Sequence, residues 1–118
     1  MASYQKLEVW QEAIELNEYV YKRTQRFPRQ TQYTYVSQMR RSALSIPSNI
    51  AEGHGRNSKK EFRRFIHYAF GSAKELETQL VIARRLELGD IENLEKAEAK
   101  LLSVLRLLNG LRRYLAQP

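Results

Sequence analysis

The sequence predicts an all-α protein, folded as an antiparallel up-down-up-down four-helix bundle. Of its 118 residues, 42% are hydrophobic but only 5 are glycine and 3 are proline. This composition is too apolar for a disordered chain and too poor in turn formers for a many-stranded β protein. Four segments repeat apolar residues at intervals of three and four, and short polar links join them. We expect a single domain over residues 1–118.

The first helix is expected over about residues 7–27. Glutamates fill its first half and basic residues its last turns, which complements the helix dipole. Pro28 should end it, because proline has no N–H to continue the helix. The predicted inward face consists of Trp10, Ala13, Ile14, Val20, Tyr21 and Thr24.

The second helix is expected over about residues 33–52. Pro47 lacks the N–H that would bond the carbonyl of Ala43, so we predict a kink there or a break at Ile46. Gly53 and Gly55 should then stop the helix, one of them as a left-handed C-terminal cap. The predicted core stripe is Val36, Met39, Ala43, Ile46 and Ile50.

The third helix is expected over about residues 58–88, and a fourth over 90–115. Ser58 and Glu61 form a capping box, Gly89 ends the third helix, and Asp90 caps the fourth. The third helix has a predicted core stripe of Phe62, Phe65, Ile66, Ala69, Ala73, Leu76, Leu80 and Ala83.

The fourth helix carries more apolar residues than one core stripe needs. Leu101, Val104, Leu105, Leu108 and Leu115 form that stripe. Beyond it lie Leu102, Leu107, Leu111 and Tyr114. This surplus predicts self-association, and the alternative is a wide contact within the core.

The charge is concentrated in the middle of the chain. Residues 19–74 hold twelve Lys or Arg against two acids, a balance of +10, so the rest sums to −3 of the formal +7. Such asymmetry favours an anionic partner, RNA or DNA, although a solvated face with helical ion pairs is the structural alternative. The predicted nucleic-acid contacts are Arg41, Arg56, Lys59, Lys60, Arg63, Arg64 and Lys74.

The positions of one arginine and three aromatic residues in the sequence also predict their contacts. Arg40 lies nearer the core and is predicted to pair with a carboxylate such as Glu52. Tyr33 and Tyr35, placed near the basic corner, would stack bases or simply pack at a helix end. Trp10 is expected in the core.

The sequence predicts no enzyme, no metal site and no cofactor. His54 and His67 are the two histidines, and neither has a second histidine or a carboxylate at metal-ligand helical spacing. There is no cysteine, which fits the reducing cytoplasm. No segment approaches the roughly 20 apolar residues of a membrane span, so no membrane partner is expected.

Three stretches carry a family resemblance. KLEVWQEAIEL, SQMRRSALSIPSNIAEGHGR and SKKEFRRFIHYAFGSAKELETQL together resemble the four-helix bundle proteins encoded in intervening sequences of bacterial 23S ribosomal RNA genes. The most specific element is the run from Ser45 to Phe62. The resemblance implies a cytoplasmic bacterial bundle, often a homopentamer, without established catalytic residues. The accessory proteins of diversity-generating retroelements, basic pentameric barrels that bind nucleic acid and a reverse transcriptase, are more distantly similar.

Together these observations predict a non-enzymatic homo-oligomer that binds structured RNA, or DNA, through its basic surface. The alternative is a protein-interaction scaffold that presents its oligomer surface to a partner enzyme. A nuclease that uses His54 or His67 is a third hypothesis.

Overall fold

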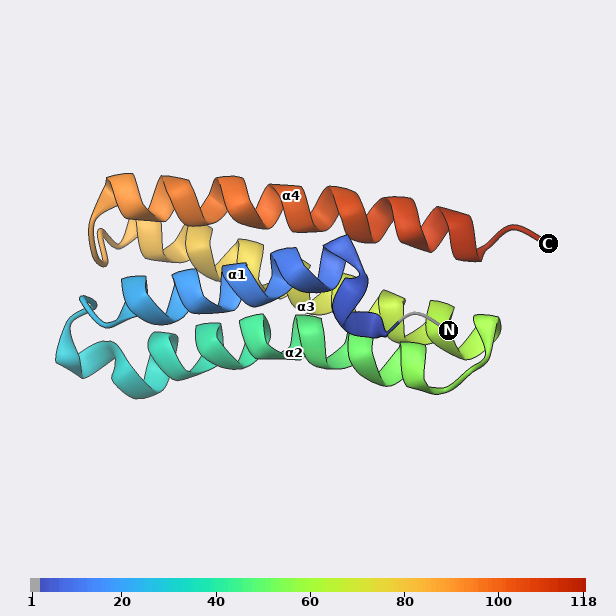
Figure 1. The fold of residues 1–118 in the computed structure, drawn as a ribbon. Coiled ribbons are helices and arrows are strands. Elements are labelled where there is room, and N and C mark those ends of the chain that lie inside the picture. The colour runs from blue at the N-terminus through green and yellow to red at the C-terminus, as the bar shows by residue number, and fades with distance from the viewer. Residues whose placement is uncertain (1–2) are drawn as a thin grey trace.

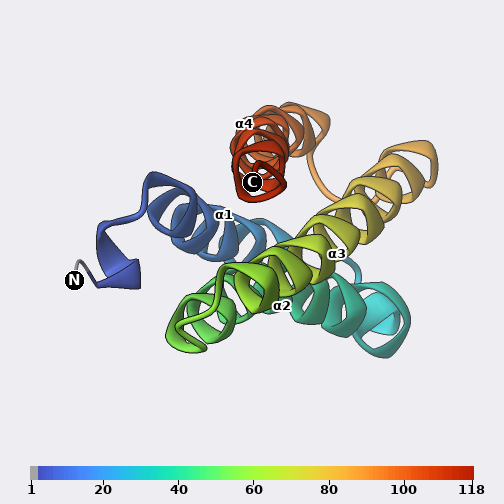
Figure 2. The same cartoon turned by 90° about the vertical axis from the view of Figure 1, so that its right-hand side faces the viewer.

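The computed structural model describes residues 3–118, and its four α-helices confirm the predicted bundle (Figure 1). The helices are α1 (Glu8–Thr24), α2 (Ser37–Gly55), α3 (Lys59–Arg85) and α4 (Ile91–Leu115). Short 3₁₀ turns at Tyr4–Lys6 and Arg29–Thr31 and a π-helical turn at Gln32–Val36 complete the described elements. Seen from one end, the helices follow one another round the bundle in chain order (Figure 2). The molecule is elongated, 47 × 20 × 20 Å.

All four helices contribute aliphatic side chains to one core. The predicted stripes of α2, α3 and α4 are buried, except that Phe62 is half-buried at the edge. On α1 the predicted face is partly wrong, because the buried residues are Val9, Ala13, Leu16, Val20 and Thr24. Trp10 and Ile14 are half-buried, and Tyr21 is 54% exposed. The guanidinium of Arg40 lies 4.0 Å from the centre of the Tyr21 ring and covers it from outside the core.

Pro47 lies inside α2, and the predicted break at Ile46 is wrong. The helix continues because the side-chain amide of Asn17, on α1, donates to the carbonyl oxygen of Ala43 at 2.5 Å. That carbonyl is the one that Pro47 leaves without an N–H partner. A contact from another helix therefore satisfies the backbone where the sequence interrupts it.

The predicted glycine stop of α2 is also wrong. The helix includes both Gly53 and Gly55, and the left-handed residue after it is Asn57, at φ 54°. Gly53 is buried, and a Cβ atom there would lie 2.5 Å from the Cβ of Phe65 on α3. Gly53 thus allows α2 and α3 to approach closely, which is a packing role.

The starts of α3 and α4 follow the predicted capping. The hydroxyl of Ser58 accepts from the N–H of Glu61 at 3.2 Å, although the Glu61 carboxylate pairs with Arg64 instead of completing the capping box. The prediction that Gly89 ends α3 is wrong, because α3 ends at Arg85 and the left-handed residue that closes it is Glu87, at φ 56°; Gly89, at φ 73°, lies in the link that follows. Asp90 accepts from the N–H of Glu92 at 2.9 Å. Across the described residues, no helix is long and apolar enough to cross a membrane.

Candidate nucleic-acid interface

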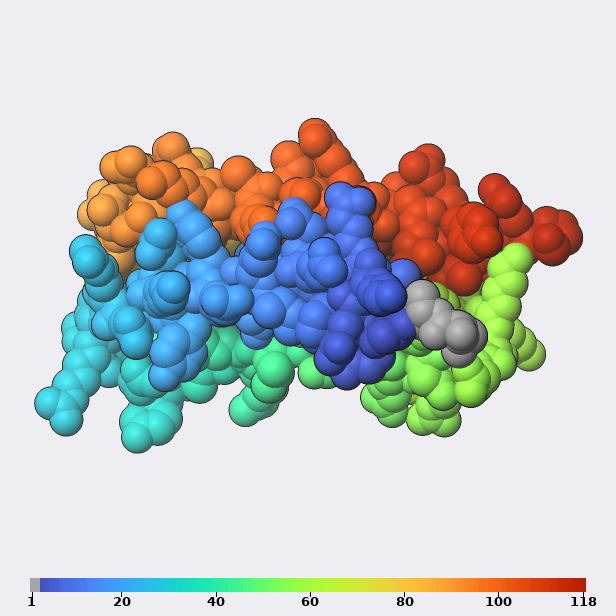
Figure 3. Space-filling view, viewed as in Figure 1, coloured from blue at the N-terminus to red at the C-terminus, as the bar shows by residue number. Residues whose placement is uncertain are grey.

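The basic residues of the α2–α3 corner lie at one end of the bundle. α2 ends and α3 begins there, which brings the exposed residues Arg56, Lys59 and Lys60 to the same end of the bundle. The end of α4 lies over this corner in the space-filling view (Figure 3). The ammonium group of Lys59 donates to the carbonyl oxygen of Gln117 at 2.7 Å and so ties the corner to the segment after α4.

The first turns of α3 carry the densest positive surface. Lys60, Arg63, Arg64 and His67 recur at helical spacing and line an open pocket of about 240 Å³ together with Glu61. Within residues 3–118, Lys60 and Arg63 have no carboxylate within ion-pair distance. Their charge is therefore available to an anion from outside.

Arg64 differs from its neighbours because it is held in place. Its guanidinium donates to the two carboxylate oxygens of Glu61 at 2.7 and 3.1 Å and to the hydroxyl of Tyr68 at 3.0 Å. The hydrogen bond from Arg64 lowers the pKa of the Glu61 carboxyl, and the same bond raises the pKa of Arg64. Arg64 thus presents a fixed and partly neutralised charge.

The remaining predicted contacts are less concentrated. Arg56 pairs with Glu52 at 3.2 Å and Lys74 with Glu77 at 3.1 Å, both one helical turn apart and exposed. Arg41 is exposed, but it lies about 22 Å from Arg56 along α2. The predicted set therefore divides into a corner and α3 cluster, with Arg41 and Lys74 farther along the bundle.

The predicted set omits the basic end of α4. Arg112 lies 4.0 Å above the Phe70 ring of α3, and Arg106 shares an open groove of about 250 Å³ with Lys74. In the described chain, Arg106, Arg112 and Arg113 have no carboxylate partner. The basic surface therefore spans α3 and α4 more than α2 and α3.

A signal for this surface exists in the sequence. Residues 75–98 hold seven acids and three bases, whereas residues 99–118 hold four bases and no acid. A net charge summed over all residues after Lys74 does not reveal this change from acidic to basic. Because α3 and α4 are antiparallel, the basic half of α4 lies beside the basic half of α3.

Two specific expectations are corrected by the structure. Arg40 donates to the hydroxyl of Thr24 at 2.9 Å and to the carbonyl oxygen of Tyr21 at 3.1 Å, so it closes the end of α1 and does not pair with Glu52. Tyr33 is 88% exposed but lies at the other end of α2 from the basic corner, and Tyr35 packs against the core. Neither tyrosine can extend the surface around Lys60.

The two histidines occupy different environments. His67 is exposed beside Arg63 on α3. His54 is half-buried, with ring centroids 5.6 Å from Phe62 and 6.5 Å from Tyr4. Over residues 3–118, no group of three His, Cys, Asp or Glu side chains could hold a metal ion.

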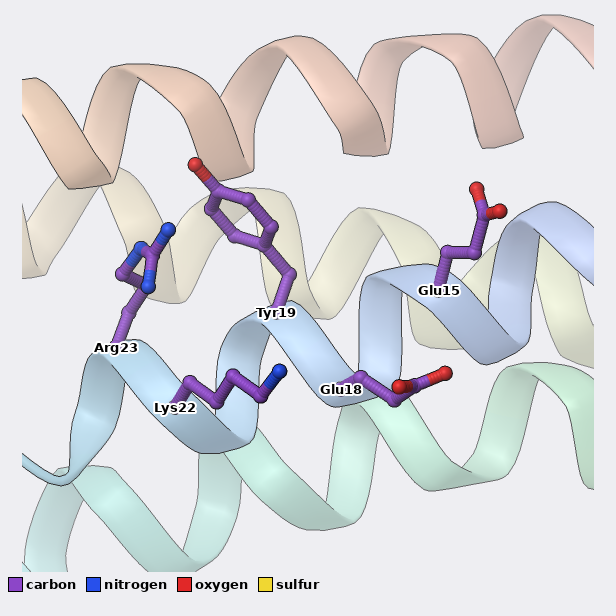
Figure 4. A pocket seen from close by; sticks show the side chains of 5 residues that line it. All are labelled: Glu15, Glu18, Tyr19, Lys22 and Arg23. Carbon is purple, nitrogen blue, oxygen red and sulfur yellow. The ribbon is translucent and has the colours of Figure 1, made fainter.

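Another open pocket, of about 280 Å³, lies along α1 away from the basic surface (Figure 4). Glu15, Tyr19 and Arg23 point from α1 toward α4, and Arg23 lies 4.2 Å above the Tyr19 ring. Glu15 already accepts a hydrogen bond from Lys100 of α4. Glu15 therefore joins α1 to α4, whereas the Tyr19 hydroxyl and the Arg23 Nε have no hydrogen-bond partner within residues 3–118. The three side chains form no constellation of nucleophile and base.

Comparison with known protein families places this chain in one of them. The sequence model described as 23S rRNA-intervening sequence protein matches residues 5–110, which is most of the chain. The chain belongs to this family. The match includes α1 to α3 entirely and most of α4, up to Gly110. A search of curated proteins gave no significant match.

Proposed function

We propose that this protein is a non-enzymatic, cytoplasmic homo-oligomer that binds structured RNA through the basic surface of α3 and α4. The observation that carries the proposal is the pair Lys60 and Arg63, which share one face of α3 with no carboxylate partner in the described chain. Phosphates that replace solvent ions around such side chains release counterions, which drives association.

RNA is favoured over DNA by the family. The description of the matching family names ribosomal RNA intervening sequences, and the basic surface suits the phosphates of a folded transcript. A duplex would lie along the bundle, because Arg106 and Arg112 extend the positive charge from the corner along α4. The proposal assigns no catalytic residue, metal or cofactor.

Self-association is part of the proposal. Leu107 and Leu111 of the apolar surplus pack against the core, which accounts for half of it. Leu102 stays exposed and is available to a second copy, whereas Tyr114, also exposed, lines the cavity at the α2–α3 corner. A pentamer rests on the family resemblance, and light scattering of the purified protein measures the number of copies directly.

The binding test compares a folded ribosomal RNA fragment with a random RNA of equal length by fluorescence anisotropy at several salt concentrations. The double variant Lys60→Glu, Arg63→Glu should lose most of the affinity for both RNAs. The control is Lys22→Glu, Lys96→Glu, which makes the same charge change at exposed positions elsewhere on the bundle. The proposal is wrong if wild-type protein binds neither RNA at low salt, or if the two double variants behave alike.

A second candidate function is a protein-interaction scaffold. Leu86 and Ile91 are exposed large hydrophobic residues at the end of the bundle opposite to the α2–α3 corner. That function predicts that Leu86→Lys and Ile91→Lys abolish recovery of a protein partner and leave RNA binding unchanged. Recovery of no protein by the wild type would contradict it.

A further inference from the structure

The α2–α3 corner contains an open cavity of about 340 Å³, a size typical of small-molecule sites. Three separate segments form it, because the end of α2, the start of α3 and the end of α4 meet at this point. The residues that line it are His54, Asn57, Ser58, Lys59, Phe62, Tyr114 and Leu115.

Aromatic side chains form much of the lining. The rings of His54 and Phe62 meet edge to face at 5.6 Å, and Phe62 is fixed by its packing against the core. Tyr114 comes from α4 and is 63% exposed. The cavity thus has a preformed apolar wall and one ring that is free to stack on an incoming planar group.

The polar residues of the cavity complement a nucleotide. The ammonium group of Lys59 lies 5.7 Å from the centre of the Tyr114 ring and contacts the carbonyl oxygen of Gln117. A phosphate would replace that neutral acceptor, because an anionic acceptor adds charge attraction to the hydrogen bond from the ammonium group. The side-chain amide of Asn57 makes no hydrogen bond within residues 3–118, so its donors and acceptor can meet a base edge.

We propose that this cavity takes one unpaired nucleotide of the bound RNA, with its base on Tyr114 and His54 and its phosphate on Lys59. The inference rests on the proposed RNA binding and adds a selectivity to it. A paired base is stacked on both faces and cannot enter, whereas a base in a loop or bulge can turn outward. The protein should therefore prefer structured RNA with an unpaired nucleotide to a continuous duplex.

The first experiment measures the affinity for two hairpin RNAs, one fully paired and one with a single bulged adenosine. Tyr114→Ala should weaken binding of the bulged hairpin roughly tenfold, the usual loss of one base stack, and leave the paired hairpin unchanged. Tyr114→Phe should keep the wild-type preference because it keeps the ring. The matched control, Tyr33→Ala, removes an exposed tyrosine at the opposite end of the bundle and should change neither affinity.

The outcomes separate the two proposals. If the wild type binds both hairpins equally and Tyr114→Ala changes neither, the cavity proposal is wrong while RNA binding stands. If the wild type binds neither hairpin, the proposed function itself fails.

A second experiment tests the cavity without an RNA fold. In NMR titrations of the full chain, 5′-AMP should shift the ring resonances of His54 and Tyr114, whereas ribose 5-phosphate should leave them in place. Excess bulged hairpin should displace the 5′-AMP, whose own base resonances should return to their free positions. Equal shifts with both compounds would show phosphate binding alone, and AMP that RNA cannot displace would place a free nucleotide in the cavity. Either result would overturn the proposal.

Discussion

The side-chain amide of Asn17 on α1 donates a hydrogen bond to the carbonyl oxygen of Ala43 on α2, four residues before Pro47. Asn17 also donates to the carbonyl oxygen of Ala13 in its own helix, at 3.1 Å. One amide therefore joins α1 to the point where α2 lacks a backbone hydrogen bond. Pro47 leaves the Ala43 carbonyl oxygen without a backbone donor, and Asn17 of the neighbouring helix supplies one.

The first prediction concerns this amide. Asn17→Ala should lower the free energy of unfolding by about 1–3 kcal/mol, because it leaves the Ala43 carbonyl without its donor. In a Pro47→Ala background the backbone N–H of residue 47 returns, so the same substitution should cost less. Urea unfolding of the four proteins in this cycle measures the coupling. Equal costs in both backgrounds would mean that Asn17 does not act through Pro47.

The second prediction concerns the contact between α2 and α3. Gly53→Ala should destabilise the protein by about 1–3 kcal/mol, since its Cβ would lie 2.5 Å from the Cβ of Phe65. Gly55→Ala is the matched control. Apart from its own turn of helix, no heavy atom lies within 4 Å of its Cβ position, so alanine should stabilise the helix by up to about 1 kcal/mol. Thermal unfolding measures both variants. Unfolding temperatures that shift in the same direction would contradict the packing role of Gly53.

The third prediction concerns pH. Lys100 on α4 donates to Glu12 and Glu15 on α1, and Ser103 donates to Glu12 at 3.1 Å. The hydrogen bond from Lys100 lowers the pKa of Glu12 below its ordinary value of 4.5, against an opposing effect of desolvation. The stability from this group is therefore present above pH 4.5 and is lost as the pH falls through the lower folded-state pKa.

Lys100→Met should reduce the loss of stability at acid pH. The free energy of unfolding should decrease less between pH 5 and 2 in the variant than in the wild type. Lys96→Met is the control, because Lys96 is exposed and, within residues 3–118, pairs only with Glu92 of the same helix. The hydrogen bonds with Glu15 and then Glu12 raise the pKa of Lys100, so its own contribution persists up to pH 10.5 and is lost above it. Identical acid profiles for both variants would exclude this role for the α1–α4 contact.

The fourth prediction extends the RNA surface onto α4. Arg106→Gln should weaken RNA binding and reduce the slope of log affinity against log salt by about 0.7–0.9, the value for one phosphate contact. Arg26→Gln, an exposed charge at the opposite end of the bundle, should leave the slope unchanged. Anisotropy titrations across a salt series give both slopes. An unchanged slope for Arg106→Gln would confine the contact to α3.

Much of the fold could be predicted from local patterns. The caps at Ser58 and Asp90 and the stripes of α3 and α4 depend on residues within a few positions of one another. The predicted cluster on α3 follows in the same way, since Lys60, Arg63 and His67 share a face through helical spacing alone. The basic residues of α4 lie far from this cluster in the chain, so only the packing of two antiparallel helices brings Arg112 above Phe70.

The sequence by itself determined that the chain forms four amphipathic helices with a positive middle segment, because helical period, capping and charge are properties of neighbouring residues. Only the tertiary structure decided that α2 passes through Pro47, that Gly53 is a packing residue, and that Arg40 closes α1. The physical reason is common to all three. A backbone acceptor, the space for a Cβ and the partner of a guanidinium are each set by atoms of another helix, and a local pattern carries no information about where that helix lies.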